Sequence, residues 1–380
     1  MTLTRMKKMD EVIDGFKKSF LEKRPFYEMA NKRDGSHSDL VKAIESYIKR
    51  FCLLIDSRYA DSAEIKRIVD SQNESIYSFD ITDIDSMYEI AKEIHAGRKK
   101  GCILSPDIIK ERVINLYEKE IERGIEMMGF GAFSSLYRFK HGQMNIITGV
   151  PTHGKSEWLD EMLVNYVISN RMKFAIFSPE NYPIELHIVK IASKFFRKSF
   201  FGHLRMSRIE LDSAIDAINN HFFFIEPHED SVNLESVLSL VEKCHEEHKI
   251  DGFVIDPWNE LEHNIPTGKT EVQYIGQALT TLRRFGRSLN ISPFIVAHPT
   301  KLKPNKPGEP TPVPQAYDIN GGAMWYNKAD NIICVYRNQD NTVDIHVQKI
   351  KFKHYGKKGT TSVVYNTSTG CYDEKTCSNR

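Results

Sequence analysis

Eight residues near the middle of the chain combine the types and the spacing that bind phosphate. Gly149-Val-Pro-Thr-His-Gly-Lys-Ser156 fits the pattern G-x-x-x-x-G-K-[ST], follows an apolar segment and opens a helical pattern. Backbone N–H groups at such glycines, together with the N-terminus of the helix, face phosphate oxygens. We therefore expect ATP or another nucleoside triphosphate (NTP) here, with a chance glycine-rich turn as the alternative. The residues predicted to line the site are Gly149, Pro151, Thr152, His153, Gly154, Lys155 on the β- and γ-phosphates, and Ser156 on Mg²⁺.

Three further side chains follow apolar segments that are typical of strands. Asp256 is predicted to hold Mg²⁺ through water or Ser156, although apolar strands often end in aspartate. Glu180 would orient and deprotonate the water that attacks the γ-phosphate. His298 would sense the γ-phosphate at the same edge of the sheet. On spacing alone, a solvated loop glutamate explains Glu180 equally well, and a histidine without a catalytic task explains His298 better.

The elements that must position these side chains alternate between short apolar runs and longer helical patterns. The runs are Met144–Thr148, Phe174–Phe177, Phe222–Ile225, Phe253–Ile255, Phe294–Ala297, Ile332–Tyr336, Val343–Ile350 and Ser362–Tyr365. Capping boxes begin two of the helices, at Ser207 with Glu210 and at Thr270 with Gln273. This alternation predicts an α/β fold with a mostly parallel sheet covered on both faces. The last runs follow one another without helices and predict an antiparallel edge.

The N-terminal part of the chain has a different pattern. Cys52–Ile55 and Ile76–Phe79 are candidate strands in a small α/β or helical unit. A linker helix is then predicted over Ser105–Arg123, because Ser105 is a good N-cap and an apolar stripe at three- and four-residue steps follows it. An apolar stripe on a helix must be buried against another element or another subunit. The predicted organisation is an N-terminal domain over 1–102, a linker helix over 103–125 and the P-loop domain over 126–380.

Composition excludes several classes of protein. Hydrophobic residues make up 41% and charged residues 27% of the 380 residues, which is ordinary for a globular protein. The net charge of +1 means that any nucleic-acid contact must come from local basic clusters. No C-x-x-C pair, signal peptide or membrane-spanning run is evident. We expect a cytoplasmic protein without membrane contact, including one that a phage encodes in its bacterial host, and an organelle is compatible with the sequence.

Six segments of the chain together resemble one family. They are LYRFKHGQMNIITGVPTHGKSEWLDEMLVN, FAIFSPEN, FVIDPWNELEH, FIVAHPTK, YDINGGAMWYNKADN and VQKIKFKHYGKKG. In order and spacing they resemble the helicase half of Twinkle-type and bacteriophage replicative DNA helicases, in the DnaB-like superfamily of hexameric RecA-fold motors. The resemblance extends from about Ile103 to the C-terminus. It implies a RecA-like P-loop core and an NTP hydrolase that acts as a DNA helicase.

The resemblance also implies roles for single residues. Glu180 in SPEN matches the catalytic glutamate, and His298 in VAHPTK matches the γ-phosphate sensor. Asn327 stands where many relatives carry a glutamine that couples nucleotide to DNA. Arg337 and Tyr365 match positions that flank the nucleotide base, with a surface arginine and a strand aromatic as the alternatives.

One position departs from the family pattern. Relatives read K-x-R-F, whose arginine enters the site of the neighbouring subunit, whereas this chain reads Lys349-Ile-Lys351-Phe. Lysine keeps the charge but lacks the planar fork that binds phosphate bidentately. Lys351 is therefore the candidate catalytic group in trans, and a solvated run of lysines is the alternative.

The family binds DNA through loops that face the central channel of a ring. The candidate loops here are His263–Lys269 and Lys301–Asn320, for which a solvated lysine- and proline-rich loop is an equal alternative. The residues predicted to bind DNA are Lys301, Lys303, Lys306, Gly321 and Gly322.

The segment Leu53–Arg58 resembles the metal-binding strand of a toprim-type primase fold. A D-x-D pair would need an acid where Arg58 stands, so we expect either a degenerate remnant that makes no primers or an unrelated small domain.

These expectations combine into a replicative-type DNA helicase. It would form a homo-oligomeric ring, a hexamer or heptamer, and move on single-stranded DNA by NTP hydrolysis with Mg²⁺; a primase or polymerase is a further candidate partner. The alternative is a RecA-fold ATPase that acts as a recombination factor, or as a weakly hydrolysing replication adaptor, without unwinding.

Overall fold

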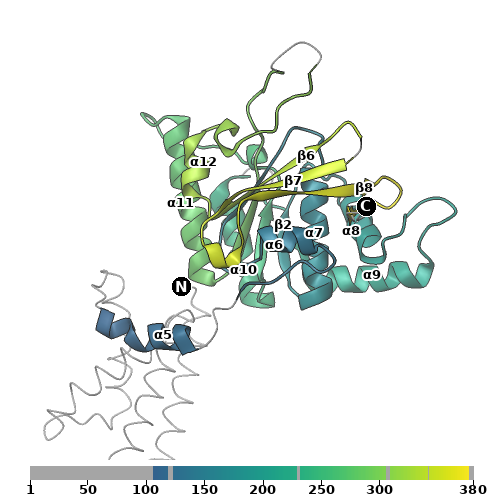
Figure 1. Ribbon diagram of the computed structural model, residues 1–380, viewed down its shortest axis with the longest axis horizontal. Coiled ribbons are helices and arrows are strands. Elements are labelled where there is room, and N and C mark those ends of the chain that lie inside the picture. Colours follow the sequence, from purple (N-terminus) through teal and green to yellow (C-terminus); the bar gives the residue numbers. More distant parts are fainter. Residues whose placement is uncertain (1–105, 119–122, 229–231, 305–308, 341, 376–380) are drawn as a thin grey trace, which may run out of the picture. The chain divides into compact units, whose positions relative to one another are not determined.

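A computed structural model describes residues 106–118, 123–228, 232–304, 309–340 and 342–375 (Figure 1). The chain divides into two compact units, Met1–Ile121 and Glu122–Arg380. In the first unit, helix α5 (Pro106–Glu118) lies within the predicted linker helix, and Val113, Leu116 and Tyr117 on it are exposed. The predicted domain over 1–102, with its candidate strands and the toprim-like segment, lies outside the described residues.

The second unit is built on one sheet of nine strands in the order β3-β2-β4-β5-β1-β6-β7-β8-β9. From β3 to β6 every neighbouring pair is parallel, and from β6 to β9 every pair is antiparallel. Both the mostly parallel sheet and its antiparallel edge were predicted; β9 was not. The strands are β1 (Asn145–Thr148), β2 (Phe174–Phe177), β3 (Phe222–Phe224), β4 (Gly252–Ile255), β5 (Ser292–Val296), β6 (Asn331–Arg337), β7 (Thr342–Ile350), β8 (Gly359–Asn366) and β9 (Cys371–Glu374).

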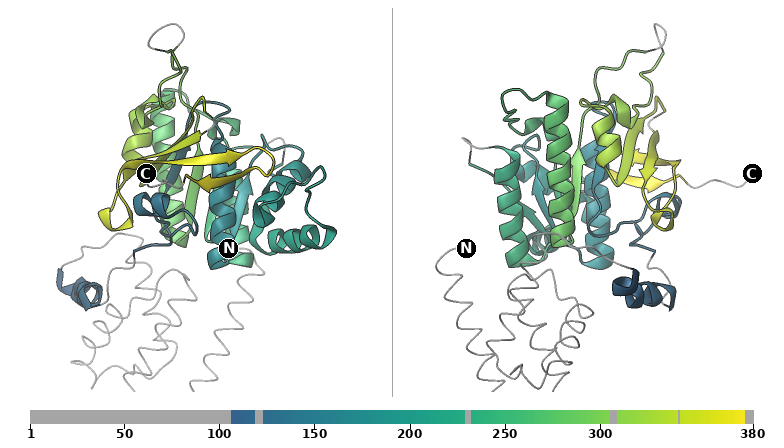
Figure 2. Two further views of the ribbon diagram at one scale, coloured as in Figure 1. Left: turned by 45° about the vertical axis from the view of Figure 1, so that its right-hand side comes forward. Right: turned by 90° about the vertical axis from the view of Figure 1, so that its left-hand side faces the viewer.

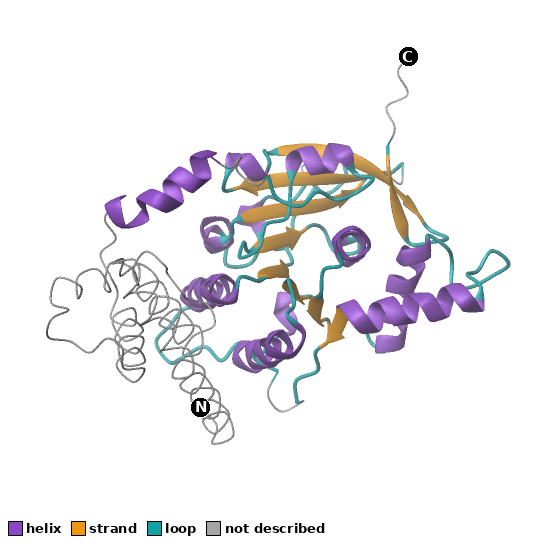
Figure 3. Ribbon diagram, turned by 90° about the horizontal axis from the view of Figure 1, so that it is seen from below, coloured by secondary structure: helices purple, strands orange, loops and turns teal. Residues whose placement is uncertain are grey.

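Helices cover the parallel strands on both faces, as Figures 2 and 3 show. One hydrophobic cluster joins the sheet to α6 (Gly131–Leu136), α7 (Lys155–Asn170), α8 (Ile184–Phe196) and α9 (Arg208–His221). The other joins it to α10 (Leu234–His248), α11 (Glu271–Leu289) and α12 (Ala323–Lys328). The described part of the chain also forms three short 3₁₀ helices, η2 (Trp258–Glu260), η3 (Ala316–Asp318) and η4 (Lys353–Tyr355).

Sequence pattern and burial agree along these elements. The parallel strands β1, β2, β4 and β5 are buried at every residue, as strands covered on both faces must be. Strand β7 instead alternates, burying Val343, Ile345 and Val347. Both predicted capping boxes are present, at the starts of α9 and α11. Among the residues that the structure describes, none of the helices is long and apolar enough to cross a membrane.

Candidate nucleotide-binding site

The turn from β1 into α7 has a backbone that only glycine permits at two positions. Gly149 has φ +148°, and a Cβ there would lie 2.2 Å from the carbonyl oxygen of Val335 on β6. Gly154 has φ +92°, and a Cβ there would lie 2.7 Å from Tyr372 Oη on β9. Helix α7 then begins at Lys155, so its free N–H groups point into the turn. The predicted phosphate loop therefore has the geometry that its sequence pattern requires.

Lys155 lies inside this turn, with its side chain directed back toward the loop. It is 5% exposed, and Nζ donates to the carbonyl oxygen of Val150 at 3.3 Å. Burial lowers the pKa of Lys155, while the carboxylates of Asp256 and Glu180 raise it. Phosphate oxygens beside Nζ would favour its charged form further.

Asp256 follows β4 at the same edge of the sheet and is 4% exposed. Its Oδ2 accepts a long hydrogen bond of 3.5 Å from Ser178 Oγ, and among the described residues Oδ1 has no hydrogen-bond partner. Burial raises the pKa of Asp256 to about 6, against the lowering effect of a hydrogen bond with Ser156. A buried carboxylate oxygen without a partner, next to a hydroxyl, fits a hard cation such as Mg²⁺, which takes one or two protein oxygens together with phosphate oxygens.

Glu180 and His298 come together from two strands. Glu180 lies in the turn after β2 and His298 lies just after β5, and Oε1 of the former is 3.9 Å from Nε2 of the latter. The Glu180 side chain is 49% exposed, so a water molecule can reach it. Burial and the nearby Lys155 lower the pKa of His298, which keeps its imidazole neutral at neutral pH and able to donate one hydrogen bond.

Arg337 and Tyr365, the predicted base-flanking pair, are in contact. The guanidinium carbon of Arg337 lies 5.1 Å from the ring centroid of Tyr365 on β8. A cavity of about 640 Å³ opens beside Arg337; its lining also includes Thr152 and His153 of the phosphate loop, Thr311 and Tyr336. Arg337 of the base-flanking pair therefore lines a space adjoining the phosphate loop, where a nucleoside has room, while Tyr365 is not part of that lining.

The predicted DNA-binding residues lie in the segment between β5 and α12. Lys301 and Lys303 are exposed between β5 and η3, and Lys306 lies outside the described residues. Gly321 and Gly322, with φ +87° and +53°, precede α12, which carries Asn327.

Lys351 does not lie near the phosphate loop of its own chain. It follows β7, whose last residue pairs with Asn331 at the start of β6, whereas the phosphate loop follows the end of the parallel neighbour β1. Its Nζ is 2.9 Å from Oδ1 of the buried Asp330. The predicted action in trans is thus not tested within one chain.

Sequence reasoning missed two features behind the site. His187 on α8 and Asp160 on α7 form a buried pair with 3.2 Å between Nε2 and Oδ1. Burial lowers the pKa of His187, but the Asp160 carboxylate outweighs it and the net pKa is raised. The signal was an aspartate inside the apolar pattern of α7. Tyr372, on the strand that was not predicted, donates through Oη to the Gly154 carbonyl at 3.3 Å.

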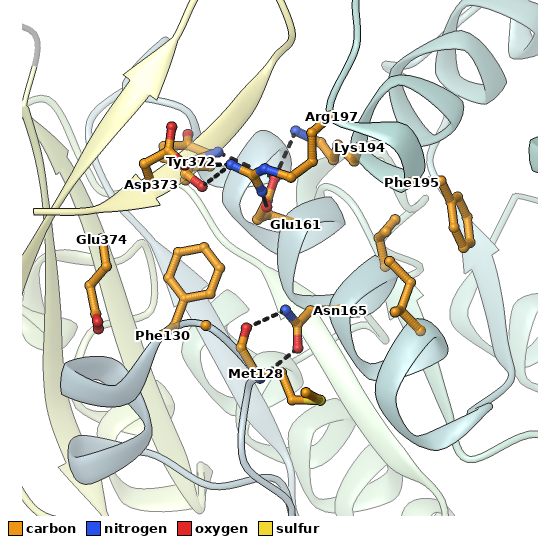
Figure 4. A pocket seen from close by; sticks show the side chains of 13 residues that line it. Met128, Phe130, Glu161, Asn165, Lys194, Phe195, Arg197, Tyr372, Asp373 and Glu374 are labelled. Carbon is orange, nitrogen blue, oxygen red and sulfur yellow. Dashed lines mark hydrogen bonds and ion pairs between the residues drawn. The ribbon is translucent and has the colours of Figure 1, made fainter. Parts of the chain in front are cut away.

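A second cavity, of about 330 Å³, lies between α7, α8 and β9 (Figure 4). Arg197 Nη1 is 3.2 Å from Glu161 Oε1, and its Nη2 is 2.7 Å from Asp373 Oδ1. Asn165 exchanges two hydrogen bonds with the backbone of Met128. The lining includes none of the predicted site residues, and these polar groups already bind one another.

Comparisons with known proteins agree with this geometry. The family model "DnaB-like helicase C terminal domain" matches residues 128–374. The "Twinkle homolog protein, chloroplastic/mitochondrial" of Arabidopsis thaliana is 35% identical over 259 residues, which cover 65% of this chain and 36% of that protein. The chain thus spans about a third of the length of this relative.

Two solved structures share the fold at 17% sequence identity. One, described as an ATPase domain, has a TM-score of 0.59, and the match covers 70% of this chain and 98% of that one. The other, a DnaB-like replicative helicase whose structure was described together with its interactions with primase, has a TM-score of 0.57, and the match covers 82% of this chain and 77% of that one. The predicted RecA-like P-loop core is confirmed by these likenesses.

Proposed function

This chain belongs to the DnaB-like helicase C-terminal domain family, and from that premise we propose that it is an NTP-driven motor that moves on single-stranded DNA and unwinds duplex. The observation that carries the proposal is the meeting of Lys155, Asp256, Glu180 and His298 at the carboxyl edge of one parallel sheet. Ligands of open α/β sheets bind at this edge. These four groups are a cation, a metal-ligand carboxylate, a base and a neutral hydrogen-bond donor.

The arrangement supports hydrolysis of a nucleoside triphosphate. The N-terminus of α7 and Lys155 would bind the phosphates, and Ser156 and Asp256 would hold Mg²⁺, which neutralises phosphate charge when bound. Glu180, half-exposed beside the γ-phosphate position, would accept a proton from the attacking water. His298, neutral and 3.9 Å from Glu180, would donate to a γ-phosphate oxygen and so report its presence to the loop that follows β5.

We further propose that the working unit is a ring, a hexamer or heptamer, with active sites shared between neighbours. Support comes from the position of Lys351, which lies at the amino end of the strands, away from the phosphate loop of its own chain. A cation at that edge can approach a nucleotide only in another copy. In a ring with head-to-tail contacts, every subunit offers this edge to the next one.

Unwinding of a forked DNA duplex tests the proposed function. The full chain with ATP and Mg²⁺ should release the displaced strand, and single-stranded DNA should stimulate hydrolysis. Lys155→Ala should do neither, and a non-hydrolysable nucleotide should support DNA binding without unwinding. Electron microscopy with that nucleotide and single-stranded DNA should show closed rings. Hydrolysis that DNA stimulates without any strand release would instead support a recombination factor or adaptor.

The loop after β5 is the proposed DNA contact, because Lys301 and Lys303 on it are exposed. Charge reversal of Lys301, Lys303 and Lys306 together should weaken single-strand binding and lower its salt dependence by a slope of about 2, since each phosphate contact contributes about 0.7. The control reverses three exposed lysines elsewhere, Lys198, Lys243 and Lys249, for the same change in net charge. If both triple variants bind alike, the loop is not the DNA surface.

A further inference from the structure

Hydrogen bonds close the loop between β5 and α12 on itself and also bind it to side chains of the sheet. Near its base, Thr300 N donates to the Asp318 carbonyl at 2.6 Å. Higher up, Gln348 Nε2 on β7 donates to the carbonyl of Pro314 at 2.6 Å. The outermost of these contacts is the hydroxyl of Tyr336 on β6, which donates to the carbonyl of Thr311 at 2.6 Å. Figure 1 shows this loop extending from the top of the unit, beyond the end of β6.

Tyr336 also touches the phosphate loop, which Gln348 does not. Its ring lies edge-on to the ring of His153, with 5.0 Å between centroids. His153 is in turn held by the next residue of β6, because the Arg337 N–H donates to His153 Nδ1 at 3.0 Å. Tyr336 is 8% exposed, so its ring and hydroxyl have little room to move independently. One side chain therefore packs on the phosphate loop and binds the backbone of the candidate DNA loop.

We propose that Tyr336 is a positioning residue that couples the phosphate loop, through His153, to the segment Thr311–Gln315 of the loop after β5. This inference rests on the proposed function for its DNA partner. The phosphates of a bound nucleotide would fix His153 and the turn around it, and the Tyr336 ring would follow. A hydrogen bond of 2.6 Å weakens steeply when its geometry changes, so the Thr311 carbonyl must either follow the hydroxyl or be released.

The test is Tyr336→Phe, which keeps the ring on His153 and removes only the hydroxyl. In the unchanged chain, a non-hydrolysable nucleotide should change the affinity for single-stranded DNA, and the variant should lose about fivefold or more of that nucleotide dependence. By reciprocity, the effect of DNA on nucleotide affinity should fall by the same factor. Loss of stability alone would not alter the ratio of DNA affinities with and without nucleotide, and thermal unfolding is measured as a control.

Two control variants separate coupling from loop anchoring. Gln348→Met removes a second side-chain bond to the segment Thr311–Gln315 but no contact with His153, so it should lower DNA affinity alike with and without nucleotide. Tyr166→Phe removes a buried hydroxyl that has no hydrogen-bond partner among the described residues, and it should leave the ratio unchanged. His153→Ala, at saturating nucleotide, should reproduce the loss of coupling from the other end.

A readout without DNA keeps this inference distinct from the proposed function. Hydrogen exchange of peptides covering Thr311–Gln315 should change when the non-hydrolysable nucleotide binds, and the change should be absent in Tyr336→Phe. If the chain binds no DNA, the motor proposal fails while this measurement still tests the coupling. The coupling through Tyr336 is overturned if nucleotide changes DNA affinity and hydrogen exchange equally in Tyr336→Phe and in the unchanged chain. It is also overturned if Tyr336→Phe and Gln348→Met respond to nucleotide in the same way.

Discussion

Two buried aspartates stand at opposite edges of the parallel strands under opposite electrostatic conditions. Asp256, at the carboxyl edge, has one oxygen without a hydrogen-bond partner among the described residues, and burial raises its pKa to about 6. Asp330, at the amino edge, is fully buried but binds Arg287 Nη2 at 3.1 Å, Lys351 Nζ at 2.9 Å and the Met144 N–H at 3.1 Å. The carboxylate at the amino edge has two cationic partners within 3.1 Å, whereas among the described residues Asp256 forms no ion pair and the more distant Lys155 only partly offsets its burial.

The difference indicates that Asp256 serves ligand binding, whereas Asp330 serves the stability of the fold. A buried carboxylate whose desolvation is only partly offset costs stability, so its retention at Asp256 is understandable if a ligand completes it. The same comparison constrains Lys351: before it can act in a neighbouring site it must leave Asp330, which still keeps Arg287. Variants at the two edges should therefore differ in kind.

The largest expected effect is at the carboxyl edge. Lys155→Ala removes the cation that we propose binds the β- and γ-phosphates and should abolish NTP hydrolysis, a loss of about a thousandfold or more, consistent with electrostatic stabilisation of the transition state. Steady-state phosphate release measures it. Lys198→Ala, which removes an exposed lysine paired with Glu210, should stay within about twofold of the unchanged chain. Residual turnover above a tenth in Lys155→Ala would remove Lys155 from the site.

Glu180→Gln should lower the rate of hydrolysis by about a hundredfold or more, because the amide cannot accept the proton of the attacking water. Nucleotide affinity should stay close to that of the unchanged chain, which distinguishes loss of a base from loss of binding. Glu185→Gln is the matched control, since Glu185 is exposed in the first turn of α8, five positions further on. Wild-type turnover in Glu180→Gln would show that another group is the base.

Replacing the two aspartates should change stability with opposite signs. Asp256→Asn removes a carboxylate whose burial outweighs its favourable contacts, as its raised pKa shows, and should raise the free energy of unfolding of the nucleotide-free protein at pH 7.5 by about 1–3 kcal/mol. Asp330→Asn leaves Arg287 and Lys351 without their carboxylate and should lower it by about 2 kcal/mol. Denaturant unfolding of both variants measures the pair, and a shift of the same sign in both would contradict the comparison.

The pH dependence follows from the raised pKa of Asp256. The folded protein holds this proton up to about pH 6, whereas the unfolded chain releases it near the ordinary value of 3.8. The folded state therefore binds more protons between these values, and stability from this group falls as pH rises from about 4 to about 6. Above that range its contribution is constant. Asp256→Asn should flatten this part of the profile, and an unchanged slope would show that Asp256 does not cause it.

Sequence patterns were sufficient for elements whose physics is local. The apolar runs and both capping boxes predicted the parallel strands and two helix starts because burial on both faces and cap hydrogen bonds leave a mark on adjacent residues. Strand β9, with Tyr372, escaped because only two of its four residues are buried and its pairing with β8 is a tertiary contact. For the same reason no pattern could show that Asp330 and Lys351, separated by 21 positions, form a pair.

The smallest expected effect is a partial return of hydrolysis in a mixture of two variants, and it tests whether Lys351 works in trans. Lys351→Ala and Glu180→Gln should each be nearly inactive alone. Mixed one to one with free subunit exchange, about a quarter of the interfaces should join an intact Glu180 to an intact Lys351, provided that assembly is random. Basal hydrolysis without DNA should therefore return in part. Basal turnover is the appropriate measurement, because sequential firing around a ring would stall at one dead site and hide the recovery.

Arg287→Ala separates action in trans from support of Asp330. It removes a partner of the same carboxylate while leaving Lys351 in place, so it should share any loss of stability seen in Lys351→Ala but should hydrolyse NTP on its own. If Lys351 acts within its own chain, every subunit of the mixture carries one defect and no turnover can return. Two results would show that Lys351 only supports the fold through its ion pair with Asp330. One is confirmed subunit exchange without any return of hydrolysis, and the other is that Arg287→Ala is as inactive as Lys351→Ala. If hydrolysis returns in the mixture and Arg287→Ala is active alone, Lys351 acts in trans. It would then leave its ion pair with Asp330 to reach the nucleotide of the neighbouring subunit.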